Sequence, residues 1–255
     1  MRVALLSDIH GNLFALNAVL DALAAEQIDQ MVCLGDVAIF GPQPRETLAR
    51  MQELNCLGVM GNTDAWALDP MPHPVRNEET EFFNAVELWS AAQLTDADRS
   101  YIRTFQPTVT IALADEPAET TLLCYHGSPR SFHDSIVATT PIADLAPMLS
   151  GHDSLVLAGG HTHQQYLRRY HDKYLLNPGS VGRAYEMGTD GTAHDATWAE
   201  FALVTWDAGQ LQLDLRRVPY DVDALIAHTH TTTMPHSQWW LSKLQSSVVR
   251  SRGVA

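Results

Sequence analysis

The sequence predicts an α/β protein, or α+β by some schemes, in which two β-sheets pack together as a sandwich flanked by helices. Apolar runs of strand length alternate with amphipathic helical segments through the first third of the chain, a rhythm typical of parallel strands joined by helices. Further along, apolar runs come in pairs around turn residues, which indicates hairpins. A helical stretch over residues 65–106 separates the two patterns and predicts an insert.

The first third supplies three strands, with a helix after each of the first two. We expect strands at residues 2–7, 30–34 and 57–60 and helices at residues 13–25 and 44–54. Leu16, Val19 and Leu23 recur at the three- and four-residue spacing of one helix face. Pro44 suits the first turn of the second helix, where no backbone amide bond is lost. The rhythm predicts parallel strands with helices on both faces of their sheet.

The rest of the chain is expected to add the insert, a second group of strands and a C-terminal extension. Helices are predicted at 78–92 and 96–104, and strands at 108–113, 120–125, 154–158, 165–170, 174–176, 201–206 and 210–217. We predict one domain over residues 1–220, with 65–106 as a helical insert or cap, and a helical extension and tail over 221–255. Long excursions from compact domains often cover a substrate.

The charge balance restricts the expected partners. The 255 residues include 30 Asp and Glu against 16 Lys and Arg, a formal net charge of −14. Such a chain repels duplex nucleic acid and anionic membranes, so neither is an expected partner. A site for an anionic ligand in this chain needs its own local positive charge, which bound metal would supply.

The cysteines and the start of the chain indicate a reducing compartment. The chain has three cysteines, Cys33, Cys56 and Cys124, and this odd number argues against a disulfide framework. The apolar run at residues 3–6 is too short for a secretory signal. We therefore expect a cytoplasmic protein whose cysteines are small buried hydrophobes. The oligomeric state is left open.

Polar side chains of one chemical kind follow five predicted strands directly. Because ligands of α/β sheets bind at the carboxyl ends of the strands, we expect these side chains to converge. Imidazole with carboxylate or amide oxygen, and no thiolate, suits Mn, Fe, Zn, Co or Ni. Seven candidate ligands exceed the four of a structural zinc site and fit two ions. The candidates are Asp8, His10, Asp36, Asn62, His126, His161 and His163.

The candidates divide into two groups. Asp8, His10 and His163 are expected to hold one ion, and Asn62, His126 and His161 the other, with Asp36 bridging both. Each motif alone is a common turn signal, and only the ordered set is specific. The similar spacing at His228-Thr229-His230 follows a helical segment without a strand or glycine, so we interpret it as solvated surface.

These motifs carry a resemblance to a known family. In chain order they are Asp8-Ile9-His10, Gly35-Asp36, Gly61-Asn62-Thr63-Asp64, His126-Gly127 and Gly160-His161-Thr162-His163. The set resembles that of the calcineurin-like metallophosphoesterases over residues 1–205. Asn12 and the run Asn177-Pro178-Gly179-Ser180-Val181-Gly182 are similar to the small prokaryotic phosphodiesterase-like branch, often named by analogy with diadenosine tetraphosphatases. The resemblance implies the metallophosphoesterase fold and the same seven metal ligands.

The expected reaction is hydrolysis of a phosphate ester by a hydroxide that bridges two divalent ions. Asn62 and His126 are expected to stabilise the transition state. Asn12 and Gly127 are candidates for orienting the substrate, and Arg183 for holding a second phosphate. The expected metal is Mn, with Fe, Zn, Ni or Co as alternatives.

The position after Asn62 distinguishes this chain from many members of the family, which have a histidine there to protonate the leaving group. Here it is Thr63, a poor acid, so the expected substrate is a small phosphodiester or a nucleotide with a good leaving group. His73 and His133 are candidates for replacing the acid. The alternatives are a phosphomonoesterase of the same fold and a non-catalytic binding module, and the complete ligand set favours an enzyme.

Aromatic residues of the insert also admit two readings. They are Trp66, Phe82, Phe83 and Trp89. Such side chains stack on nucleobases in some proteins, but their helical spacing favours ordinary core packing.

Overall fold

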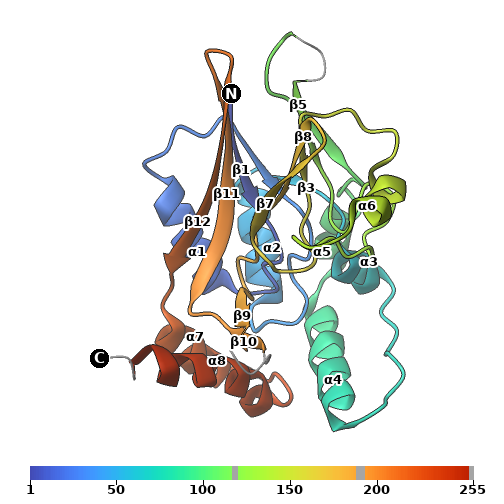
Figure 1. Ribbon diagram of the computed structural model, residues 1–255. Helices are drawn as coiled ribbons and strands as arrows, with labels where there is room; N and C mark the ends of the chain where they lie inside the picture. Colours follow the sequence, from blue (N-terminus) through green and yellow to red (C-terminus); the bar gives the residue numbers. More distant parts are fainter. Residues whose placement is uncertain (117–119, 188–192, 253–255) are drawn as a thin grey trace.

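The computed structural model describes residues 1–116, 120–187 and 193–252, with side chains described up to residue 244. Two five-stranded sheets lie side by side, with helices on their outer sides (Figure 1). One sheet has the strand order β12-β11-β1-β2-β3 and the other β4-β5-β6-β8-β7. The predicted two-sheet sandwich of the α/β class is therefore confirmed.

The first sheet combines the start of the chain with its last strands. Its members are β1 (Arg2–Leu6), β2 (Gln30–Cys33), β3 (Leu57–Gly58), β11 (Trp198–Asp207) and β12 (Gln210–Pro219). Strands β1, β2 and β3 are parallel, as predicted, whereas β11 runs antiparallel to β1 and to β12. In the register, Ala4 lies opposite Met31 on one side and Leu203 on the other.

The second sheet contains the middle strands. Its members are β4 (Val109–Ala112), β5 (Thr121–Cys124), β6 (Val156–Ala158), β7 (Tyr166–Tyr170) and β8 (Lys173–Asn177). Strands β5, β6 and β8 are parallel, and β4 and β7 are antiparallel edge strands. The predicted pairs at 108–113 with 120–125 and at 165–170 with 174–176 are confirmed.

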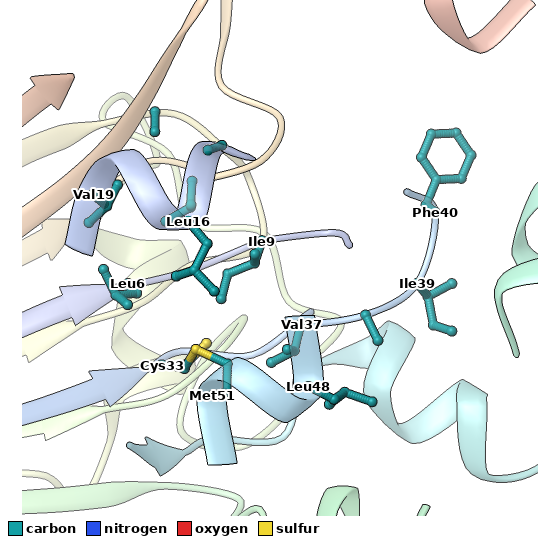
Figure 2. Close-up of a cluster of buried hydrophobic side chains, with 14 of the residues drawn as sticks. Leu6, Ile9, Leu16, Val19, Cys33, Val37, Ile39, Phe40, Leu48 and Met51 are labelled. Carbon is teal, nitrogen blue, oxygen red and sulfur yellow. The ribbon is translucent and has the colours of Figure 1, made fainter. Parts of the chain in front are cut away.

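The expectation of helices on both faces of the first sheet is wrong. Helices α1 (Leu13–Leu23) and α2 (Pro44–Glu53) both pack on its outer face, against alternate residues such as Ala4 and Leu6. Figure 2 shows Leu6 and Ile9 lying against Leu16 and Val19 of α1. The intervening Val3 and Leu5 face the second sheet instead. A strand buried on both faces is continuously apolar whether a helix or a sheet covers it, so the pattern did not distinguish the two.

The outer face of the second sheet is covered by a helix that the sequence did not predict. Helix α6 (Ile142–Leu149) buries Leu145 and Leu149 against Leu123 and Leu157 of that sheet. Only eight residues long, it contains Pro147, and proline normally indicates a break in a helix.

The stretch between β3 and β4 is helical, as expected. It contains α3 (Asn62–Leu68), α4 (Glu78–Gln93) and α5 (Asp96–Ile102). The predicted helices at 78–92 and 96–104 correspond to α4 and α5, whereas α3 was not predicted. Asn77 caps α4 by accepting a hydrogen bond from Thr80 N at 2.9 Å. In Figure 1, α4 projects below the second sheet.

The C-terminal helices pack on the core of the first sheet. They are α7 (Val222–Thr229) and α8 (Ser237–Arg252), and α8 packs against the small ribbon of β9 (Tyr185–Met187) and β10 (Ala193–Asp195). Trp240 Nε1 donates a buried 2.7 Å hydrogen bond to Phe40 O. Among the described residues, no helix is long and apolar enough to cross a membrane. The division into domains at residue 220 stays a prediction.

Candidate metal centre

The seven candidate residues lie in loops at the carboxyl ends of β1, β2, β5 and β6 and at the start of α3. Backbone hydrogen bonds join these loops: Asp8 N donates to Gly35 O at 2.9 Å, and Gly160 N donates to His126 O at 2.8 Å. The two sheets are joined directly, because His161 N donates to Asp8 Oδ2 at 3.0 Å. The fold therefore brings the strand ends of both sheets to one place.

The side chains form two adjacent clusters. Their potential ligand atoms lie within 4.8 Å of one another in each cluster. The clusters are Asp8, His10, His163 and Asp36, His126, His161. Asp36 Oδ2 lies 3.5 Å from His126 Nε2 and 3.8 Å from His10 Nε2, so this carboxylate lies between the clusters. Asn62 Oδ1 joins the second cluster at 2.9 Å from His126 Nε2.

Backbone carbonyls set the orientation of three histidine rings. His10 Nδ1 donates to Ile39 O at 2.8 Å, His126 Nδ1 to Leu34 O at 2.7 Å, and His163 Nδ1 to Arg183 O at 3.0 Å. A proton on Nδ1 leaves Nε2 of the neutral ring as a lone pair directed into the cluster. This is the usual arrangement of metal-binding histidines, whose second nitrogen is held by a carbonyl or carboxylate.

The donor set fits divalent cations. His10 Nε2 and His163 Nε2 lie 3.1 Å apart, and two facing lone pairs at that separation repel unless a proton or a metal ion lies between them. Asp8 Oδ1 is buried without a hydrogen-bond partner in the described chain and lies 3.2 Å from His163 Nε2. A buried unpaired carboxylate oxygen is costly unless a cation compensates it.

The electrostatics of the clusters are strongly coupled. Burial, together with the electrostatic effect of the neighbouring His163 ring, lowers the pKa of His10 to about 4. Burial also opposes the charged form of His126, but the Asp36 carboxylate outweighs it and raises the pKa of His126 to about 9. Neighbouring imidazoles with such different proton affinities are typical of functional clusters.

Backbone strain is concentrated at the candidate ligands. Left-handed φ angles occur at Asp8 (52°), His10 (48°), Asp36 (58°), His161 (66°) and His163 (55°). Such angles are uncommon for residues with a side chain and cost about 1–3 kcal/mol each, so they persist where a function retains them. They turn the side chains that follow each strand back toward the clusters.

Gly35 permits a close backbone approach beside the centre. Its φ is +102°, and a Cβ there would lie 2.7 Å from Gly61 Cα and 2.8 Å from His126 Nδ1. A side chain at this position is therefore excluded by both the backbone angle and the space.

Asp64 supports the centre, a role that the sequence did not reveal. Its fully buried carboxylate accepts hydrogen bonds from Asp36 N at 2.7 Å, Val37 N at 3.0 Å and Gly61 N at 3.1 Å. Burial and the Asp36 charge raise the pKa of Asp64 to about 7, against the effect of the three amides. The Gly61-Asn62-Thr63-Asp64 motif was visible in the sequence, but its link to Asp36 is a tertiary contact.

Asn12 and Gly127, the residues predicted to orient the substrate, both make close contacts with neighbouring loops. Asn12 is buried, donates from Nδ2 to Gly182 O at 3.1 Å and caps α1 by accepting from Ala15 N at 3.1 Å. These bonds commit its amide to structural contacts. Gly127 lies beneath a loop, where a Cβ would be 2.8 Å from Ser131 O.

Arg183 connects the centre to a cavity of about 510 Å³ that is lined by none of the seven candidate ligands. Its guanidinium lies 4.5 Å above the Phe40 ring and 3.6 Å from Asp195, while its carbonyl holds His163. The cavity is lined by Phe40, His73, Asn77, Glu79, Thr80, Phe83, Arg183, Trp239 and Lys243.

Three further histidines named in the sequence analysis lie in different surroundings. His73 lines the cavity, whereas His133 is exposed and lies against Phe132 at a ring distance of 4.7 Å. His228 packs against Phe14 at 5.9 Å and belongs to neither cluster. Of the aromatic candidates for base stacking, Phe83 lines the cavity, while Trp89 Nε1 donates to Thr233 Oγ1 at 3.1 Å.

Comparisons with known proteins agree with this geometry. A family model described as a calcineurin-like phosphoesterase superfamily domain matches residues 1–202. The protein MJ0912 of Methanocaldococcus jannaschii is 27% identical over 237 residues, covering 86% of this chain and 88% of that protein.

Two crystal structures share the fold. A metallophosphoesterase from Sphaerobacter thermophilus has a TM-score of 0.73 and 24% identity, covering 97% of this chain and 99% of that one. The protein PH1004 of Pyrococcus horikoshii has a TM-score of 0.76 and 21% identity, covering 94% and 96% respectively.

Proposed function

Because this chain belongs to the calcineurin-like phosphoesterase superfamily, whose model spans residues 1–202, we propose that it hydrolyses a small phosphodiester or nucleotide with two divalent metal ions. Members of the superfamily are phosphoester hydrolases that typically bind divalent metals. The diester preference, the identity of the metal and the role of each residue are the proposal.

The observation that carries the proposal is the pair of ligand clusters sharing Asp36. Its Oδ2 atom lies within 3.8 Å of an Nε2 atom in each cluster. Asp8, His10 and His163 would hold one ion, and Asn62, His126 and His161 the other. Two bound cations supply an activated water and neutralise the charge of the phosphate. We expect Mn to be the bound metal. The same imidazole and carboxylate ligands also accept Fe, Zn, Ni and Co, which are the alternatives.

The chain's own residues orient the phosphate and oppose its developing charge. His126 is fixed by Leu34 O, and Asn62 lies 2.9 Å from it, so the two side chains present a rigid polar surface at the second cluster. Gly127 and Asn12 are proposed to shape the loops around the phosphate. Arg183, whose guanidinium carbon lies 4.5 Å from the centre of the Phe40 ring at the cavity wall, would hold a second anionic group.

Thr63 supports the diester preference. Its Oγ1 atom is buried and makes no hydrogen bond within the described chain, and its backbone amide donates to Asp36 Oδ1 at 2.9 Å. A hydroxyl in this position protonates a leaving group poorly. Hydrolysis then requires a good leaving group or an acid from elsewhere in the protein.

The proposal is tested by comparing hydrolysis of bis-p-nitrophenyl phosphate and p-nitrophenyl phosphate. Protein stripped of metal and reloaded with Mn is expected to prefer the diester, and Asp36→Ala is expected to abolish turnover. A faster monoester rate would identify a phosphomonoesterase of the same fold. No turnover of either ester by metal-loaded protein would contradict the catalytic proposal and favour a binding module.

A further inference from the structure

His73 is held in place by a clamp on its backbone. It lies in the loop between α3 and α4, yet its N donates to Asn84 Oδ1 at 2.9 Å and its O accepts from Asn84 Nδ2 at 2.7 Å. Asn84 is 5% exposed and belongs to α4. Both backbone groups of an exposed loop residue are thereby bound by one buried side chain, which fixes the position of His73 relative to the helix.

The half-exposed imidazole ring lies beside a buried carboxylate. Nε2 lies 3.2 Å from Oε2 of Glu87, a carboxylate that is 3% exposed. This contact is an ion-pair distance and not an aligned hydrogen bond, since Oε2 makes none in the described chain. The ring lies nearly parallel to that of Trp66, at 13° and 6.2 Å, and tilted against Phe83 at 6.3 Å.

Glu87 links this histidine to the metal centre. Burial, and then the negative charge of Asp36, raise the pKa of Glu87 to about 8. Since Asp36 belongs to both proposed metal clusters, the Glu87 carboxyl lies within electrostatic reach of the reaction centre. The Glu87 carboxyl therefore holds a proton at neutral pH, 3.2 Å from Nε2 of His73, which lines the cavity with Arg183.

The other charged groups lining the cavity are unsuitable as acids. Lys243 pairs with Glu79 at 2.8 Å, and Arg183 pairs with Asp195 at 3.6 Å. Lysine and arginine side chains hold their protons too tightly to donate at neutral pH. The histidines of the two clusters are committed to metal in the proposed function. His73 is the one imidazole lining this cavity among the described residues.

We propose that His73 is a catalytic residue that protonates the leaving oxygen, with Glu87 and Asn84 as positioning residues. The inference rests on the proposed function. As the bond between phosphorus and the leaving oxygen breaks and the bond to the attacking water oxygen forms, His73 Nδ1 gives its proton to the leaving oxygen. Nε2 takes the proton held by Glu87. The attacking water releases a proton to solvent, and solvent then returns a proton to Glu87.

The dependence of the rate on the leaving group tests this step. The substrates are methyl 2,4-dinitrophenyl, methyl p-nitrophenyl and methyl phenyl phosphate, in order of increasing leaving-group basicity. We expect His73→Gln to lower kcat/KM for the phenyl ester by about 10²–10⁴-fold, and for the dinitrophenyl ester by less than about 5-fold, because a stable phenolate needs no acid. Glu87→Gln is expected to show the same trend with smaller losses.

His171→Gln is the matched control, since His171 is an exposed histidine in the turn between β7 and β8, outside the cavity. It is expected to match the wild type on all three esters. Calorimetric titration with Mn is expected to give His73→Gln the same stoichiometry and affinity as the wild type, and melting curves show that each variant is folded. In ¹⁵N spectra of the wild type, Nδ1 of His73 is expected to be protonated at neutral pH.

The outcomes separate this inference from the proposed function. An equal loss on all three esters, no loss on any, or a His73 ring with an unprotonated Nδ1 would refute the acid role while the diesterase stands. A wild type without metal-dependent turnover of any ester would refute the proposed function, and the acid role with it.

Discussion

Replacing Asp64 tests whether a residue that is not a proposed metal ligand can still affect metal binding by holding the backbone of a ligand. Its carboxylate accepts three buried amide hydrogen bonds, one of them from the backbone of Asp36. In Asp64→Asn one oxygen becomes an NH₂ group. If the remaining oxygen keeps the bonds to Asp36 N and Gly61 N, Val37 N faces another donor.

The expected cost follows from these contacts. An unpaired buried donor costs about 1–3 kcal/mol, and the two remaining bonds lose their charge assistance. Removal of a carboxylate whose pKa burial raises to about 7 offsets part of this loss. We therefore expect a net loss of about 1–3 kcal/mol in unfolding free energy, and Mn affinity lower by about 10–100-fold, as for other residues that orient metal ligands.

Denaturant unfolding and calorimetric titration with Mn measure the two effects separately. Asp98→Asn is the matched control, because Asp98 also accepts a backbone hydrogen bond, from Thr95 N at 2.7 Å, but at the start of α5. It is expected to lose some stability and no metal affinity. Wild-type Mn affinity in Asp64→Asn would refute the argument that Asp64 positions Asp36.

Three further replacements test the fold and its titration. Gly35→Ala places a Cβ 2.8 Å from His126 Nδ1 at a φ of +102°; calorimetry is expected to show weaker Mn binding, and unchanged affinity would contradict the steric argument. Trp240→Phe removes the buried bond to Phe40 O, so denaturant unfolding should show a loss of about 1–3 kcal/mol; an unchanged midpoint would mean that this bond does not anchor α8. The pKa of Glu87 is raised to about 8 from its ordinary value of 4.5, so the folded protein binds this proton more tightly than the unfolded chain does. Protonation of Glu87 therefore contributes fully to the free energy of unfolding below pH 4.5, and this contribution is lost as the pH rises to about 8. Melting curves should therefore show the stability of Glu87→Gln increasing relative to that of the wild type as the pH rises from 4.5 to about 8. A stability difference that stays constant with pH would contradict this expectation.

The candidate ligands were predictable because their placement follows from local pattern and one topological rule. An apolar run followed by Gly-Asp or His-Gly marks a strand end, and parallel strands present their carboxyl ends on one edge. The structure gathers all seven residues, including His161 and His163 from the second sheet. Their assignment as ligands stays a proposal.

The missed features depend on contacts between distant segments. The strand–helix rhythm predicted helices on both faces of the first sheet, but its inner face packs on the second sheet, and Val3 and Leu5 are apolar in either environment. Helix α6 is short and contains Pro147, and β9 and β10 are three residues each. The clamp of Asn84 on His73 joins residues 11 apart across a loop that carries no periodic pattern.

We propose that two metal ions bind at the seven candidate ligands. Anomalous scattering from crystals of Mn-loaded protein tests it most directly, because it places each ion and counts them. We predict two peaks per chain, one beside Asp8, His10 and His163 and one beside Asn62, His126 and His161, with Asp36 contacting both. A single peak, or peaks away from these residues, would contradict the dinuclear centre.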